Sequence, residues 1–202
     1  MADKRPLGAV ILAVGFTLSL ITNILAMVPF LLAFAAYTYV VGVLIRGVGW
    51  IVLGANIKRT LAVIGVSVLV FSPIFMAGLM LHEDVAKLLG IGRGTAIGLA
   101  LTSWAAYSIL EASGYISLRR RSKAFYVSMV SIITIIYIIY LALGLVGEAP
   151  PSIDDLLHLT PIVLIPLSVS AASNIVGTLK IKIGVEAPGS EPLPQEITPS
   201  PS

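Results

Sequence analysis

The sequence predicts an all-α integral membrane protein with six transmembrane helices and cytoplasmic N- and C-termini. Three observations lead to this prediction: the composition, the uncharged apolar runs and the placement of the basic residues. Of the 202 residues, 57% are hydrophobic and only 11% are charged, whereas about 25% of the residues of a soluble globular domain are charged. Such a composition is typical of a chain embedded in a bilayer.

The apolar runs set the number of spans. About 20 apolar residues cross the hydrocarbon core as a helix, and residues 6–45 carry no charge, so this stretch is long enough for two helices. Four further runs supply one helix each, and Glu111 alone interrupts the run 94–118. We predict spans at about 7–25, 29–45, 60–81, 95–118, 125–146 and 160–179, within one transmembrane domain of residues 1–183.

Local residues justify the individual elements. Asn23 and Pro29 separate the first two helices, since proline is tolerated in a first helical turn. Pro73 lies inside the third helix and is expected to kink it. A glycine-rich turn at 90–94 precedes the fourth helix, Ile, Val and Tyr dominate the fifth, and Pro161 stands near the start of the sixth. Five prolines and little apolar content beyond position 184 predict a disordered cytoplasmic tail over residues 184–202.

Basic residues orient the helices. Lys and Arg concentrate in the cytoplasmic loops of membrane proteins, and eleven of the thirteen in this chain fall on one side of the predicted helices. Lys87 and Arg93 are the two on the other side. The eleven are Lys4, Arg5, Arg46, Lys58, Arg59, Arg119, Arg120, Arg121, Lys123, Lys180 and Lys182. This asymmetry predicts a multi-pass protein of the cell membrane, and it explains the net charge of +3 without a nucleic-acid partner.

The segment 46–57 is apolar but too short to cross the bilayer by itself. It is interpreted either as an extension of the second helix or as an interfacial segment with Trp50 at headgroup depth. Because an arginine at the bilayer centre costs at least about 2.5 to 3.5 kcal/mol, we expect Arg46 at the cytoplasmic interface.

Glu111 is the exceptional residue of the sequence, because an ionisable group within a span indicates a functional site. Tyr107 and Ser103 precede it by four and eight residues and share its helical face. This face is expected either to line a substrate or proton path, or to pair Glu111 with Arg46 or the 119–123 cluster and so fix helix packing.

Two more polar stripes recur at spacings of four: Ser170, Asn174 and Thr178 on the sixth helix, and Gly15, Ser19 and Asn23 on the first. Small and hydroxyl residues at this spacing allow membrane helices to approach closely and to hydrogen-bond, so packing is the favoured interpretation. The alternative is a substrate pocket. Its predicted residues are Ser103, Tyr107, Glu111, Asn174 and Asn23.

Motifs for chemistry are scarce. The chain has no cysteine and two histidines, which argues against haem ligation and thiolate metal sites. His82, Glu83, Asp84, Asp154, Asp155 and His158 share the predicted outer face, but they lack metal-ligand spacing and are interpreted as solvated loop residues. No hydrolase motif appears. We therefore predict no cofactor, no resident metal and no enzymatic activity.

The basic face is expected to contact anionic lipid headgroups, at about 1 kcal/mol per residue, and to be available to a membrane or cytoplasmic protein partner. The residues assigned to this contact are Arg46, Lys58, Arg59, Arg119, Arg120, Arg121 and Lys123.

In size, span number and orientation the chain resembles the substrate-binding subunits of energy-coupling-factor vitamin transporters. Ala9 and Ala13 form the AxxxA pattern with which those subunits meet their coupling partner. The resemblance covers this five-residue pattern and the topology, and it does not extend to a vitamin-binding loop, so no family is assigned.

Two functional hypotheses follow. The first is a non-enzymatic structural or accessory membrane protein, in which the polar stripes pack helices and the basic face meets lipid or a partner. The second is a small transporter, or the substrate-binding membrane subunit of one, with its pocket around Glu111. The sequence slightly favours the first, because Glu111 is the only charge predicted within the membrane.

Overall fold

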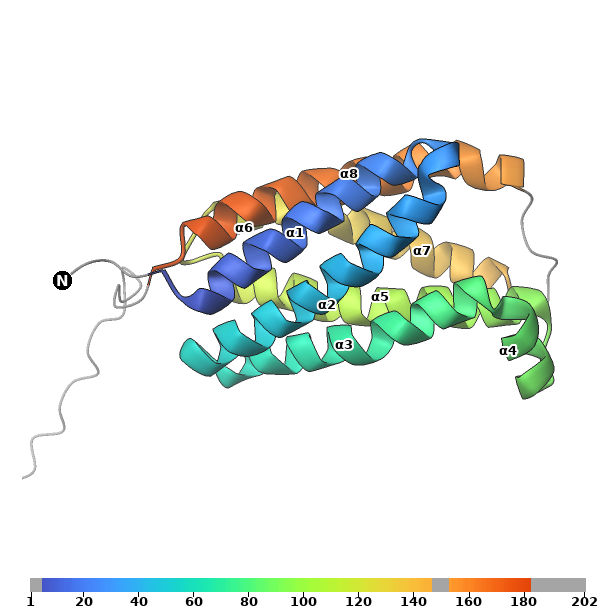
Figure 1. Ribbon diagram of the computed structural model, residues 1–202, viewed down its shortest axis with the longest axis horizontal. Coiled ribbons are helices and arrows are strands. Elements are labelled where there is room, and N and C mark those ends of the chain that lie inside the picture. Colours follow the sequence, from blue (N-terminus) through green and yellow to red (C-terminus); the bar gives the residue numbers. More distant parts are fainter. Residues whose placement is uncertain (1–4, 147–152, 183–202) are drawn as a thin grey trace, which may run out of the picture.

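The computed structural model describes residues 5–146 and 153–182, and within these ranges the chain is helical and contains no strand (Figure 1). The elements are α1 (Leu7–Ala26), η1 (Pro29–Leu31), α2 (Leu32–Asn56), α3 (Arg59–Met80), α4 (His82–Leu89), α5 (Arg93–Leu118), α6 (Ala124–Ser128), α7 (Ser131–Gly144) and α8 (Ile153–Leu179). The predicted tail, residues 184–202, lies outside the described residues.

Among the described residues, five helices are long and apolar enough to cross a membrane, and a sixth is added if α4 and α5 count as one bent span. Pro73 lies inside α3, which continues through it as a helix. The fifth predicted helix consists of α6 and α7, which are separated by a turn at Met129 and Val130. The chain therefore has the all-helical character expected of a multi-pass membrane protein.

The second helix differs from its predicted bounds. Of the two interpretations of the segment 46–57, the extension of the second helix is the one found, because α2 runs without interruption to Asn56. Arg46 therefore lies ten residues before the helix end, which is about 15 Å along the axis at about 1.5 Å per residue, and it is only 9% exposed. The side chain of Arg46 is therefore not exposed for the expected contact with headgroups, because it is buried inside the bundle, where the Glu111 carboxylate offsets the cost of its charge.

The turn between α4 and α5 bends the chain by 107°. Gly90 supplies the left-handed conformation, φ 64°, that ends α4, and this conformation favours glycine. The glycine-rich segment 90–94 thus forms a tight corner. In Figure 1, α4 projects sideways at the end of the bundle opposite the start of α1.

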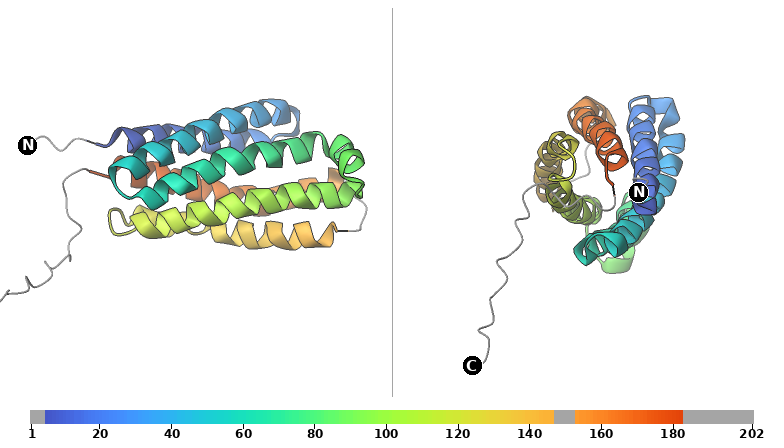
Figure 2. Two further views of the ribbon diagram at one scale, coloured as in Figure 1. Left: turned by 90° about the horizontal axis from the view of Figure 1, so that it is seen from below. Right: turned by 90° about the vertical axis from the view of Figure 1, so that its left-hand side faces the viewer.

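The six long helical segments form a closed ring. Each contacts its neighbours in the order α1, α2, α3, α5, α7, α8 and back to α1, and the view along the bundle in Figure 2 shows them surrounding a common interior. Apolar side chains such as Phe34, Ile136 and Val66 are exposed on the outer surface, as expected for a lipid-facing surface. No helix occupies the centre of the ring in the described part of the chain.

Close backbone contacts hold one half of the ring together. A Cβ added at Gly8 would lie 2.3 Å from the backbone nitrogen of Leu53, and one at Gly54 would lie 2.3 Å from that of Ala62. Only glycine permits α1, α2 and α3 to approach so closely. Ala9 and Ala13 are also buried within this bundle, so the AxxxA pattern packs the chain against itself and is not presented to a coupling partner.

The basic clusters lie together at one end of the bundle. The described members stand where α2, α5 and α8 end and where α1, α3 and α6 begin, and these helix ends lie together in Figures 1 and 2. Lys58, Arg59, Arg119, Arg120 and Lys123 are at this end and, unlike Arg46, are outside the helical interior. Lys87 and Arg93 lie at the opposite end, with α4.

Candidate functional site: a polar cavity within the helical ring

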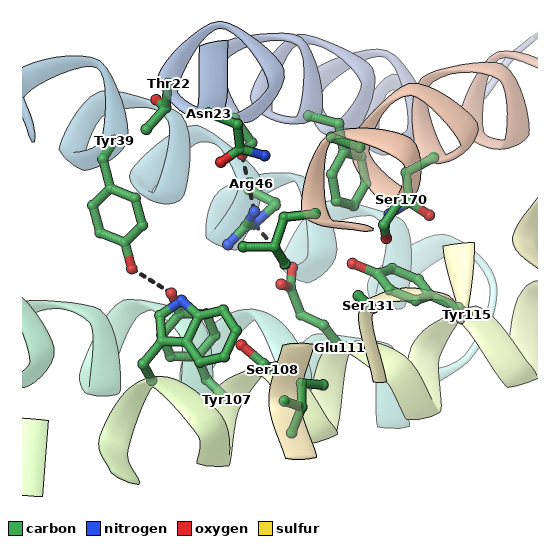
Figure 3. Close-up of a pocket in the computed structure, with 17 residues that line it drawn as sticks. Thr22, Asn23, Tyr39, Arg46, Tyr107, Ser108, Glu111, Tyr115, Ser131 and Ser170 are labelled. Atoms are coloured by element: carbon green, nitrogen blue, oxygen red, sulfur yellow. Dashed lines mark hydrogen bonds and ion pairs between the residues drawn. The ribbon is translucent and has the colours of Figure 1, made fainter. Parts of the chain in front are cut away.

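A buried ion pair crosses the interior of the ring. The Nε atom of Arg46 on α2 lies 2.9 Å from Oε1 of Glu111 on α5, and the two residues are 9% and 4% exposed. Figure 3 shows the two side chains pointing toward each other. Of the two partners expected if Glu111 forms an ion pair, Arg46 is therefore the one found, and not the 119–123 cluster.

One neutral donor and one neutral acceptor add to this contact. Trp50 donates from Nε1 to the same Glu111 oxygen at 2.8 Å, and Arg46 donates from Nη1 to Ser19 Oγ at 2.9 Å. Trp50 follows Arg46 by four residues, so the unbroken helix α2 presents both side chains on one face. The continuation of α2 beyond Arg46 is thus what places the indole beside the carboxylate.

A second contact between α2 and α5 lies about two helical turns from the ion pair of Arg46 and Glu111. Tyr39 precedes Arg46 by seven residues on the same face of α2, and its hydroxyl hydrogen-bonds to the hydroxyl of Tyr107 on α5 (Figure 3). Tyr107 in turn precedes Glu111 by four residues. Because α2 and α5 are not neighbours in the ring, these side chains are the groups that connect them across the interior.

The polar side chains surround a cavity of about 70 Å³, enough for several water molecules, since one requires about 10 to 15 Å³. Five of the six ring helices line it, and α3 does not. The lining residues are Phe16, Ser19, Thr22, Asn23, Tyr39, Arg46, Trp104, Tyr107, Ser108, Glu111, Tyr115, Ser131, Ile135, Leu167, Ser170, Ala171 and Asn174. Figure 3 shows these side chains converging from several helices.

Two buried side-chain atoms within the described part of the chain lack a hydrogen-bond partner, and both belong to residues that line this cavity. They are Arg46 Nε and Asn174 Oδ1. Arg46 Nε is close enough to Glu111 for an ion pair, but its N–H does not point along a hydrogen bond to the carboxylate. Since an unsatisfied buried polar group costs about 1 to 3 kcal/mol, the cavity has a donor and an acceptor that a guest molecule would stabilise.

Aromatic rings close the cavity toward the basic end. Tyr115 stacks on Phe125 with ring centroids 6.3 Å apart, and the rings of Phe16 and Trp50 each lie 6.1 Å from that of Tyr115. Trp50 and Phe125 are fully buried. These rings come from α1, α2, α5 and α6, so they form an apolar layer between the polar cavity and the basic loops.

Four of the five residues predicted for a substrate pocket meet at this cavity. Asn23, Tyr107, Glu111 and Asn174 line it. Ser103 does not: it is buried, and its hydroxyl donates at 2.7 Å to the carbonyl of Ala100 within α5. Of the helical face predicted from positions 103, 107 and 111, only Tyr107 and Glu111 therefore line the cavity.

Several lining residues were not assigned to the pocket from the sequence. Tyr39, Ser131 and Tyr115 carry no local signal in an apolar span, because isolated hydroxyl residues are common there. Ser19 and Ser170 belonged to predicted stripes but were interpreted as packing residues. Tyr39 can be recognised from the sequence only if the second helix is extended to include residues 46–56. Tyr39, Arg46 and Trp50 then lie on one face of the same helix.

Hydroxyl groups on α8 and α7 also join helices, as the packing interpretation of the stripes predicts. Ser170 donates at 2.8 Å to the carbonyl of Ser128, and Thr134 donates at 3.2 Å to that of Val163. Thr178 instead bonds within its own helix, to the carbonyls of Asn174 and Ile175. The α8 stripe therefore combines helix packing with the lining of the cavity.

At the opposite end of the bundle, Glu83 pairs with Arg93 at 3.1 Å on the exposed surface. Asp154, Asp155 and His158, the other members of the outer cluster, lie outside the described side chains.

No family model, no curated protein and no solved structure matches the chain. The function is therefore argued from the cavity and its charges.

Proposed function

We propose that this protein is a six-span membrane protein whose ring of helices binds a small polar solute and carries it across the membrane, alone or as the substrate-binding subunit of a larger transporter. Both termini are in the cytoplasm in this proposal, and α4 with α5 is the fourth span. The protein is not an enzyme and requires no cofactor. Its location is the cell membrane.

One observation carries the proposal: a polar cavity inside the ring contains both an arginine and a glutamate. Membrane helices pack without charged residues, and ionisable groups inside spans usually face a water-filled path or a binding site. Here the two charges come from α2 and α5, which are separated in the ring by α3. A site enclosed by several helices is where a relative motion of those helices would expose a bound solute alternately to the two sides.

Cysteine labelling tests whether the cavity is reached by water. The chain has no cysteine, so Ser108→Cys on the cavity wall introduces one thiol. Because the thiolate is the reactive form and needs a polar environment, we expect this thiol to react with a small membrane-impermeant methanethiosulfonate. If the protein is a transporter, the Ser108→Cys thiol in sealed membrane vesicles should react with the reagent whether it is added to the inside or to the outside.

Thr102→Cys on the same helix is the matched control. Thr102 is exposed on the outside of the ring and does not line the cavity, so its thiol faces lipid and is expected to stay unreactive. Equal protection of both thiols would contradict the transport proposal, since the interior would then be permanently closed to water.

The orientation rests on the basic end of the bundle, which the positive-inside tendency places in the cytoplasm. We expect Arg120→Cys, in the 119–123 loop, to be labelled only from the cytoplasmic side, and Lys87→Cys, on α4, only from the outside. Both positions are exposed. The reverse pattern in sealed vesicles of known orientation would overturn the topology.

A second candidate function, a structural or accessory membrane protein, is favoured by a different observation. The direct contact between Arg46 and Glu111, together with the hydroxyl bond from Ser170 to the Ser128 carbonyl, fixes helices without any ligand. In that case the basic face, Lys58, Arg59, Arg119 to Arg121 and Lys123, binds anionic lipid or a protein partner. The Ser108 labelling result separates the two candidates.

A further inference from the structure

The balance of charge around the cavity indicates what kind of solute fits it. Arg46 and Glu111 bring one positive and one negative charge, and together they leave the interior neutral. A solute carrying a single net charge would make this low-dielectric interior charged, which is strongly unfavourable when the charge has no counterion. The solute that preserves neutrality carries either no charge or one of each sign.

The ion pair itself is incomplete. Its single contact joins Arg46 Nε to Glu111 Oε1, and Oε1 also accepts from Trp50. A guanidinium has five N–H groups and a carboxylate has two oxygens that accept hydrogen bonds. The contacts of Arg46 with Glu111, Ser19 and Tyr107 still leave both ions with unused capacity, unlike a bidentate pair in which each ion would satisfy the other.

The two unpaired atoms favour a guest molecule that carries both a hydrogen-bond donor and a hydrogen-bond acceptor. Asn174 Oδ1, in a residue that is 1% exposed, accepts nothing within the described residues, and Arg46 Nε donates to nothing there. A guest with an ammonium group would donate to Asn174 Oδ1 and to the free capacity of Glu111. A carboxylate on the same guest would accept from Arg46.

The aromatic residues favour the same guest. Phe16, Tyr107 and Tyr115 line the cavity, and the face of an aromatic ring attracts an ammonium group. Phe16 already makes such a contact with Arg46, whose guanidinium carbon lies 5.7 Å from the ring centre. A volume of about 70 Å³ restricts the guest to a few non-hydrogen atoms.

From these observations we infer that the cavity binds a small zwitterion of the size of glycine or alanine, with its carboxylate on Arg46 and its ammonium on Glu111 and Asn174. The inference rests on the proposed function and names its substrate class. Binding replaces one direct ion pair by two charge-assisted contacts and leaves the net charge of the interior unchanged.

A matched ligand panel tests the inference on the full-length protein in mild detergent. Glycine and alanine are compared with ethylamine, propionate and propionamide, three small molecules that carry a positive charge, a negative charge and no charge, respectively. Isothermal titration and the ligand-dependent rise of the unfolding temperature are the measurements. We expect binding of a zwitterion at least about tenfold tighter than that of the other three, because hydrogen bonds to charged groups are worth about twice those to neutral groups.

Single-charge variants sharpen the test. Glu111→Gln should weaken zwitterion binding about 10- to 100-fold and shift the preference to propionate, whereas Arg46→Gln should shift it to ethylamine. Asn174→Leu should weaken zwitterion binding and leave propionate binding unchanged. Glu83→Gln, in the exposed pair with Arg93, is the control and should bind as the parent protein does.

Preference of the parent protein for the amine, the acid or the amide, or binding of none of the panel, overturns the inference. The ligand panel needs no variant, so its outcome stands even if Arg46→Gln or Glu111→Gln fails to fold. A reactive Ser108→Cys thiol combined with any of these results would leave the proposed transport function intact and reject only the zwitterion. Unreactive Ser108→Cys would reject the proposed function itself.

Discussion

Replacing Glu111 by glutamine is expected to lower the free energy of unfolding by about 3 to 5 kcal/mol, the usual cost of removing one partner of a buried ion pair. The variant leaves the Arg46 guanidinium in the interior of the ring with no opposite charge beside it. It also removes the charged acceptor of the Trp50 indole. Unfolding in mixed detergent micelles, followed by tryptophan fluorescence, measures the loss.

The double variant Arg46→Gln with Glu111→Gln is the informative companion, because it removes both charges. We expect it to be more stable than either single variant, since no unpaired charge remains buried. The exposed pair supplies the control: Glu83→Gln should cost less than about 1 kcal/mol, because both side chains are about half exposed. If Glu111→Gln lowers the free energy of unfolding by no more than Glu83→Gln does, Arg46 and Glu111 do not form a buried ion pair.

The second large effect is expected at the contact between α2 and α3. In Gly54→Ala the added methyl group would lie 2.3 Å from the backbone nitrogen of Ala62, so one helix must shift away from the other. We expect destabilisation by about 1 to 3 kcal/mol, as for overpacked cores. The same unfolding measurement applies, and the lower thermal midpoint should appear without any ligand.

Gly144→Ala is the matched control for this substitution. Gly144 also lies in a helix, but a Cβ there would meet no atom within 4 Å. Since alanine favours a helix over glycine by at most about 1 kcal/mol and Gly144 is the last residue of α7, this variant is expected to be unchanged or slightly more stable. Opposite signs for the two substitutions support the close approach of α2 and α3, and equal stabilisation would argue against it.

Helix positions followed from the sequence wherever apolar length alone decides them. The predicted segments 7–25 and 60–81 correspond to α1 (Leu7–Ala26) and α3 (Arg59–Met80). At α2 the sequence left two interpretations of residues 46–57 open, and the interfacial one was preferred because Arg46 was assigned the full cost of a charge in lipid. That cost is offset by Glu111, and no local pattern around position 46 indicates a partner on another helix.

The same limit applies to the site. Glu111 was recognisable because a carboxylate is rare in an apolar span, and Tyr107 followed from its helical spacing. Ser131 and Tyr39 were not recognisable, since which hydroxyls face the interior depends on how the ring closes. Ser103 shows the converse, because it has the right spacing from Glu111 but turns to the carbonyl of Ala100.

The position of Arg46 on α2 has a consequence for the synthesis of the protein. Arg46 and Glu111 are 65 residues apart in the sequence, and at about 5 to 20 residues per second the ribosome adds Glu111 only about 3 to 13 s after Arg46. During this interval the hairpin of α1 and α2 carries an arginine whose only polar contact within that hairpin is Ser19. We therefore expect Arg46 to reach its buried, paired position only after α5 has been made.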